Sequence, residues 1–130
     1  MVARAEPETF LALLSDADRE ALLARGGSRR YSRGEHLMHQ GEPGGQILIL
    51  LEGHTKATFV DPRGEEIVLS FRGPGDVLGE LSFVHPEPRS SGVIAIEPVE
   101  ARALAAADFS AFLSERPSAA LKALNRRRLQ

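Results

Sequence analysis

The chain has 130 residues with 16 basic and 18 acidic side chains, six phenylalanines and one tyrosine, and it lacks cysteine and tryptophan. This composition excludes iron–sulfur and cysteine-ligated zinc sites, and the net charge of −2 with so few aromatic residues disfavours direct binding of nucleic acid. Because the sequence shows neither a signal peptide nor the roughly 18 apolar residues of a membrane span, we expect a soluble, cytoplasmic protein.

The first predicted elements are two short helices. Apolar residues recur at helical intervals over about residues 7–25, and Pro7 suits the first turn of a helix. Ser15 followed by Asp18 is typical of a second N-cap inside this run, so we expect a break there. Gly26 and Gly27 then end the helical pattern.

From about residue 29 to residue 105, the pattern changes to short apolar runs separated by glycine and proline turns. The expected strands are Leu37-Met38, Ile47 to Leu51, Ala57 to Val60, Ile67 to Phe71, Val93 to Ile96 and Val99 to Leu104. Such regular short strands indicate an antiparallel sandwich or barrel, and a jelly roll is the first choice among these. The run from Ile47 to Leu51 is apolar on both faces and must be covered on both sides, whereas Ile67, Leu69 and Phe71 should share one face.

The helical pattern returns over about residues 108–130. Asp108 is the expected N-cap of the first of these helices, and Pro117 suits the first turn of the second. The expected fold of residues 1–130 is therefore a single, mainly β domain, an antiparallel jelly roll with helices at both ends.

A candidate ligand site lies between the strand runs that end near Phe71 and begin near Val93. A helix that begins near Gly79 would present unpaired backbone N–H groups, and glycine lets a ligand approach them closely. Arg89 could bind two oxygens of one phosphate, with further donors from Ser90. Together these groups predict a small phosphate site.

Glu80 needs a different partner, because an ionised carboxylate only accepts hydrogen bonds and is repelled by phosphate. It could accept from a sugar hydroxyl while Arg89 binds the phosphate, which indicates a nucleotide. One arginine without a Walker loop fits a phosphodiester better than a triphosphate. The alternative is that Glu80 and Arg89 pair with each other across a surface loop.

The segment from Leu78 to Ser82, followed by Arg89-Ser90, resembles the phosphate-binding cassette of the cyclic nucleotide-binding domains of catabolite-activator and FNR-type bacterial transcription regulators. A second signature of that family is similar to Leu37 to Gly44 and the strand after it. The resemblance implies that the glycine and the residues after it bind phosphate, the glutamate binds the ribose 2′-hydroxyl and the arginine binds exocyclic phosphate oxygens. The implied ligand-binding residues are Gly79, Glu80, Leu81, Ser82, Arg89 and Ser90.

The residues and the resemblance together lead us to expect an allosteric regulatory module rather than an enzyme, with no catalytic residues, no metal and no cofactor. Its ligand would be cAMP or a related cyclic nucleotide, and occupancy would be relayed through the C-terminal helix. That helix could form a homodimer, and DNA would be bound only through a domain absent from this chain.

Two alternatives remain open. Phe83 and Ser91 depart from the family pattern, so the domain could keep the fold but serve only for dimerisation or docking. A metal-binding jelly roll of the cupin type would need converging histidines. His36 and His39 are three residues apart, which on a regular strand directs them to opposite faces.

Overall fold

A computed structural model describes Glu6, residues 8–79, Arg89 and residues 91–128. The helices are α1 (Phe10–Leu13), α2 (Asp16–Leu23), α3 (Ala106–Glu115) and α4 (Pro117–Arg128). The strands are β1 (Gly27–Tyr31), β2 (His36–Met38), β3 (Gln46–Glu52), β4 (Thr55–Val60), β5 (Glu66–Arg72), β6 (Val77–Leu78), β7 (Gly92–Ala95) and β8 (Val99–Ala105). The predicted mainly β fold with helices at both ends is confirmed.

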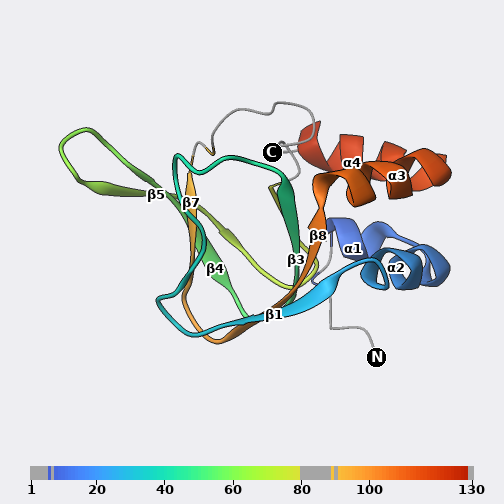
Figure 1. Cartoon of the computed structure of the whole chain (residues 1–130), viewed down its shortest axis with the longest axis horizontal. Coiled ribbons are helices and arrows are strands. Elements are labelled where there is room, and N and C mark those ends of the chain that lie inside the picture. The colour runs from blue at the N-terminus through green and yellow to red at the C-terminus, as the bar shows by residue number, and fades with distance from the viewer. Residues whose placement is uncertain (1–5, 7, 80–88, 90, 129–130) are drawn as a thin grey trace.

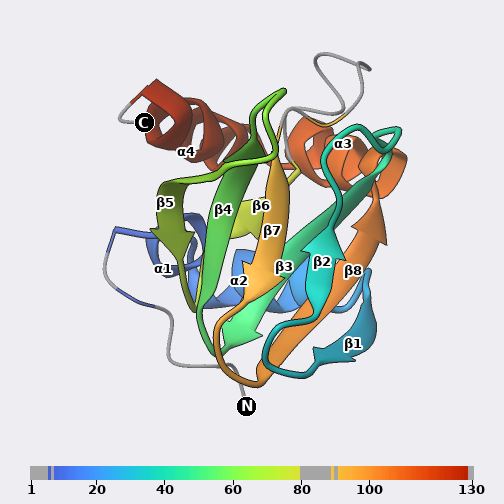
Figure 2. The same ribbon diagram turned by 90° about the vertical axis from the view of Figure 1, so that its left-hand side faces the viewer.

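The described strands form two four-stranded sheets, with the orders β1-β8-β3-β6 and β2-β7-β4-β5. Every strand pairing in them is antiparallel. The helices lie together on the side of the first sheet, and the β4–β5 hairpin extends away from them (Figures 1 and 2). None of the helices in the described parts of the chain combines the length and the apolar composition of a membrane-spanning segment.

The strand β3 is buried on both faces, as predicted. Ile47, Ile49 and Leu51 contact the helices in one hydrophobic cluster, together with Phe109 and Phe112. The alternate residues Leu48 and Leu50 belong to a second cluster with Met38, Leu78, Val93, Ala95, Val99, Ala101 and Ala103. The first cluster lies between sheet and helices, and the second lies between the two sheets.

The predicted helix boundaries are confirmed at Ser15 and Pro117 but not at Asp108. The Ser15 hydroxyl accepts a hydrogen bond from the Asp18 amide at 3.1 Å, and Pro117 is the first residue of α4. The helix α3 instead begins at Ala106, directly after β8, and Asp108 lies in its first turn. The Gly45 carbonyl accepts from the Ala106 amide at 2.9 Å, so a distant loop takes the place of a local side-chain cap.

The β4–β5 pairing corrects the expectation that Ile67, Leu69 and Phe71 share a face. The register skips Leu69, so that Ile67 pairs with Phe59 and Phe71 with Lys56. Phe59 and Lys56 are three residues apart and therefore lie on opposite faces of the sheet. The three β5 side chains are exposed, and Phe71 retains 66% of its accessible surface.

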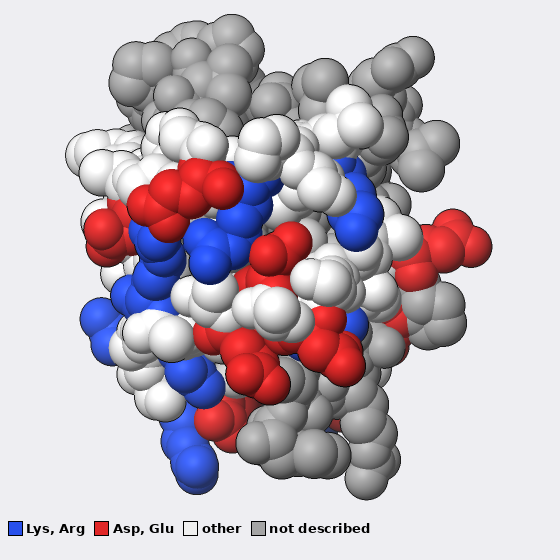
Figure 3. All heavy atoms as spheres, turned by 90° about the vertical axis from the view of Figure 1, so that its right-hand side faces the viewer, with Lys and Arg blue, Asp and Glu red and all other residues white. Residues whose placement is uncertain are grey.

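The polar strand β1 was not predicted. Four of its five residues are exposed, and the fifth, Tyr31, is half-buried. Its backbone pairs with β8 along its whole length, from Gly27 opposite Ala103 to Tyr31 opposite Val99. On the helix-covered face of the molecule, the described basic and acidic side chains lie beside one another rather than forming a patch of one sign (Figure 3).

Candidate functional site

Gly79 follows directly after β6, and the start of β6 is bonded firmly to neighbouring backbone. The Leu50 amide donates to the Asp76 carbonyl at 2.9 Å, and the buried Asp76 carboxylate accepts from the Gly73 amide at 2.8 Å. β6 then pairs with β3. These bonds place Gly79 beside Gln46, the first residue of β3.

Both the backbone conformation and the surroundings of Gly79 require a glycine. Its φ of +83° lies in the left-handed region, where other residues are strained. A Cβ atom here would lie 2.8 Å from the Gln46 carbonyl oxygen, 2.8 Å from Nη1 of Arg89 and 3.0 Å from Cε of Met38. The Arg89 guanidinium therefore lies directly against the Gly79 backbone.

Arg89 is held by the β2–β3 loop through both its backbone and its side chain. Its amide donates to the Glu42 carbonyl at 2.8 Å, and its own carbonyl accepts from the Gly41 amide at 2.8 Å. Its Nη2 donates to the Gln46 carbonyl at 2.9 Å. These bonds fix both the position of the residue and the direction of its side chain.

The environment of Arg89 favours an anionic ligand. Burial lowers the pKa of the Arg89 guanidinium, and the nearby Glu42 carboxylate opposes this shift. A guanidinium that has lost part of its hydration and contacts a neutral carbonyl gains most from a partner with negative charge. The chemistry offered here is that of anion binding through charge-assisted hydrogen bonds.

The structure thus brings together two of the predicted site residues, Gly79 and Arg89. Glu80, Leu81, Ser82 and Ser90 lie outside the described residues, as does Phe83. The shared ligand of Glu80 and Arg89 therefore stays a prediction.

Sequence reasoning missed the role of Gly45 and Gln46. Gln46 accepts from Arg89, while the adjacent Gly45 accepts from Ala106, so this dipeptide connects the arginine to the first residue of α3. Both contacts use backbone carbonyls, which residue types do not reveal. The glycine-rich turn before β3 was the only signal in the sequence that backbone groups are accessible there.

The histidines correct a further expectation. His36 and His39 stack with ring centroids 4.4 Å apart and an 11° angle between the ring planes, instead of facing opposite sides. An irregularity in β2 between His36 and Met38 changes the alternation. The nitrogen lone pairs of the two stacked rings lie in nearly parallel planes, one above the other, which does not suit binding of one ion by both rings. No group of three potential metal ligands occurs in the described parts of the chain.

The family model for the cyclic nucleotide-binding domain matches residues 28–116, more than half of the chain. The chain belongs to the cyclic nucleotide-binding domain family. The match begins within β1 and ends at Arg116, between α3 and α4. It includes Gly79, Arg89 and the β2–β3 loop that holds them.

This cyclic nucleotide-binding domain is similar to parts of three bacterial regulators. The "CRP-like cAMP-activated global transcriptional regulator" of Mycobacterium tuberculosis is 33% identical over 87 residues, which are 67% of this chain and 39% of that protein. The N-terminal domain of a transcriptional regulator from Streptomyces coelicolor superposes with a TM-score of 0.74 and 34% identity, covering 92% of this chain and 87% of that chain. The catabolite activator protein of Thermus thermophilus superposes with a TM-score of 0.80 and 28% identity, covering 92% of this chain and 57% of that chain.

The cyclic nucleotide-binding domain described here therefore spans about two fifths of the mycobacterial relative. Both superpositions confirm the predicted fold class. The three proteins named above are described as transcriptional regulators or as an activator.

Proposed function

We propose that this domain binds a cyclic nucleotide, cAMP or a close relative, with Arg89 holding the phosphate beside Gly79. The observation that supports this most is the contact of a half-buried guanidinium with a left-handed glycine backbone, an arrangement suited to an anion. The description of the mycobacterial relative as cAMP-activated supports the choice of nucleotide.

The proposed ligand-binding residues are Gly79, Glu80, Leu81, Ser82, Arg89 and Ser90. In this proposal Arg89 binds the exocyclic phosphate oxygens, and Glu80 accepts from the ribose 2′-hydroxyl. Charge-assisted hydrogen bonds contribute about 1.5–3 kcal/mol each. After the free-energy cost of ordering the ligand and the side chains is subtracted, a few such bonds come close to the binding free energy of roughly 8 kcal/mol that micromolar affinity requires.

The proposed relay runs through the β2–β3 loop to the C-terminal helices. A bound phosphate competes with the Gln46 carbonyl for the donors of Arg89, and the neighbouring Gly45 carbonyl holds the first residue of α3. The ligand can then shift α3 and α4 only if the domain binds it more tightly with these helices in one position than in another.

In this proposal the domain performs no chemistry and passes its signal to an attached part. The longer relatives are transcriptional regulators, which supports a DNA-binding domain outside this chain and a homodimer formed through α4. The net charge of −2 and the mixed charges on the helix-covered face argue against DNA binding by the domain itself (Figure 3).

Calorimetric titration with cAMP, cGMP and linear 5′-AMP tests the proposal. We expect saturable binding of at least one cyclic nucleotide and markedly weaker binding of 5′-AMP. Arg89→Ala should weaken cyclic nucleotide binding by about 10- to 100-fold, because it removes charge-assisted bonds to the phosphate. Arg63→Ala is the matched control, since the Arg63 side chain in the β4–β5 turn is 82% exposed.

Two outcomes would contradict the proposal. Absence of heat and of any rise in melting temperature with every cyclic nucleotide would favour the alternative, a dimerisation or docking module of the same fold. Undiminished binding by Arg89→Ala would place the nucleotide elsewhere.

A further inference from the structure

His54 joins three segments that are distant in sequence, at the opposite end of β3 from Arg89. It lies in the turn between β3 and β4, where its Nδ1 contacts Glu97 Oε2 at 2.5 Å and its Nε2 contacts Glu6 Oε2 at 2.7 Å. Glu97 belongs to the turn between β7 and β8, and Glu6 precedes α1. One imidazole ring therefore connects Glu6 to two turns of the β-roll.

Glu6 is also the residue that directs the chain into α1. Its amide donates to the Pro74 carbonyl at 2.8 Å, and its carbonyl accepts from the Thr9 hydroxyl at 2.7 Å. Thr9 is the N-cap of α1, and its hydroxyl oxygen accepts from the Ala12 amide. The Glu6 carboxylate adds a side-chain attachment at the point where the start of α1 is set.

Gly73 provides the space in which this contact forms. A Cβ atom at Gly73 would lie 2.6 Å from Glu6 Oε1 and 2.6 Å from Cδ2 of His54. A side chain of any size at this position would therefore displace the carboxylate or the ring. The contact depends on a glycine that belongs to the loop between β5 and β6.

The geometry requires a protonated ring. A carboxylate only accepts hydrogen bonds, so Nδ1 and Nε2 must both carry a proton to bond Glu97 and Glu6 together. The two carboxylates lie on different ring nitrogens and cannot converge with the ring on one metal ion. A neutral imidazole has a single N–H and can serve only one of them.

The two carboxylates also affect the pH range over which the His54 ring stays protonated. The hydrogen bond to Glu97 and then that to Glu6 raise the pKa of His54, against a smaller opposing effect of burial. In the β5–β6 loop that packs against the ring, the Asp76 carboxylate accepts from the Gly73 amide, and Arg72, the last residue of β5, donates to the Ser70 hydroxyl. Because the folded-state pKa is raised, the stabilisation is complete below about pH 6.5 and is lost as the pH rises through the folded-state value.

We propose that His54, Glu6 and Glu97 form a proton-dependent clasp that holds Glu6, and with it the start of α1, on the β-roll and loosens as the pH rises. The Glu6 carboxylate is the side chain that leaves the ring, because its contact of 2.7 Å is longer than the 2.5 Å contact of Glu97, and the Ile96 amide also donates to the His54 carbonyl and keeps the two turns together. The clasp is independent of nucleotide binding, which takes place at the other end of β3.

Hydrogen exchange of the Thr9 and Leu11 amides measures the clasp, since these groups bond to the Glu6 and Gly75 carbonyls. We expect their protection factors to fall about two- to fivefold between about pH 5.5 and about pH 8.5, the range for an exposed ion pair. His54→Gln should give the lower protection at both pH values. Gly73→Ala should do the same without changing any charge.

Gly27→Ala is the matched control, because a Cβ atom there meets its nearest heavy atom only at 3.7 Å. It should keep the pH dependence. Equal protection at both pH values in the unaltered protein, or pH dependence that persists in His54→Gln, would overturn the clasp. The nuclear magnetic resonance titration of His54 in the unaltered protein gives a second test, and a midpoint at or below about 6.5 would also overturn it.

Discussion

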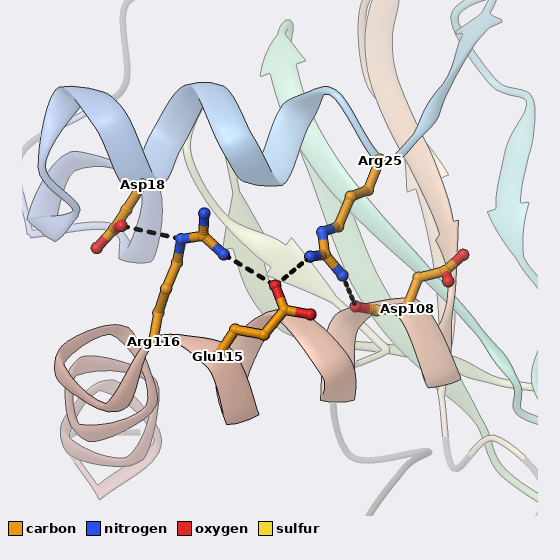
Figure 4. A network of polar contacts seen from close by, with 5 residues as sticks. All are labelled: Asp18, Arg25, Asp108, Glu115 and Arg116. Atoms are coloured by element: carbon orange, nitrogen blue, oxygen red, sulfur yellow. Dashed lines mark hydrogen bonds and ion pairs between the residues drawn. The ribbon is translucent and has the colours of Figure 1, made fainter.

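Nε of Arg116 donates to Oδ1 of Asp18 at 3.1 Å and thereby joins α2 to the residue that separates α3 from α4. Nη1 of Arg116 contacts Glu115 at 3.2 Å, and Glu115 also accepts from Arg25 (Figure 4). The Arg116 guanidinium lies 5.1 Å from the ring centroid of Phe112. The junction of the last two helices is therefore held by α2 and by Arg25, which follows it.

We expect Arg116→Ala to lower the free energy of unfolding by about 1–2 kcal/mol, because it removes a partly buried ion pair and a cation–π contact. Arg116→Lys should recover only part of this loss, since an ammonium lacks the planar fork of donors. Chemical denaturation measures both changes. Arg63→Ala should stay within about 0.5 kcal/mol of the unaltered protein, and a loss equal to that of Arg116→Ala would contradict a specific role for this junction.

A pair of glycine substitutions separates backbone strain from close contact. Gly64→Ala should lower the free energy of unfolding by about 1 kcal/mol through backbone strain alone. Gly64 has a φ of +88°, and no heavy atom lies within 4 Å of an added Cβ atom. Gly79 has a similar φ, but the added Cβ atom of Gly79→Ala would also clash with the Gln46 carbonyl. This substitution should therefore lower the free energy of unfolding by about 1–3 kcal/mol more than Gly64→Ala. Equal losses on chemical denaturation would show that the Gln46 contact is easily relieved. Only Gly79→Ala should also weaken nucleotide binding.

The Ala106 amide should report nucleotide binding at a distance. It donates to the Gly45 carbonyl, next to the carbonyl that accepts from Arg89. If phosphate changes the Arg89 contact, hydrogen exchange at Ala106 should change on addition of cyclic nucleotide. The Asp61–Glu65 bond in the β4–β5 turn serves as an internal reference and should not respond. Unchanged exchange at Ala106 under saturating ligand would argue against this relay.

Tyr31 should make the protein sensitive to alkaline pH. Burial raises the pKa of Tyr31, with a smaller opposing effect of Arg29 and a further rise from Glu35. Because the folded-state pKa is raised, the stabilisation is present below about pH 10 and disappears as the pH rises through the folded-state value. Tyr31 is the only tyrosine, so phenolate absorbance follows it alone. The midpoint of the Tyr31 titration should be higher in the folded protein than in the protein unfolded by denaturant. Tyr31→Phe should reduce the loss of stability at alkaline pH.

Local signals in the sequence predicted much of this fold. The apolar run of β3, the hydroxyl of Ser15 and the ring of Pro117 act on their own segments, and the structure confirms all three. The prediction that Asp108 is the N-cap of α3 was wrong. The first amide of this helix donates instead to the Gly45 carbonyl, which is far away in sequence. The polar strand β1 carries no apolar pattern, so only its pairing with β8 reveals it.

Irregular pairing limited the prediction of side-chain directions. A skipped residue in β5 and an irregularity in β2 shift the alternation on which the expectations for Ile67 and His39 rested. In the candidate site, residue types were enough to predict that Gly79 and Arg89 lie together. Their partner Gln46 contributes a carbonyl, which every residue has, and Glu80 stays a prediction.

The two-sided strand β3 has a consequence for how the molecule comes apart. Removing the helical layer would leave Ile47, Ile49 and Leu51 in water on a strand whose other side is still packed, and opening the roll would do the same to Leu48 and Leu50. Neither the helical layer nor the second sheet can therefore separate from β3 without exposing apolar β3 side chains to water. Helices and roll should therefore melt in one step, at a single temperature.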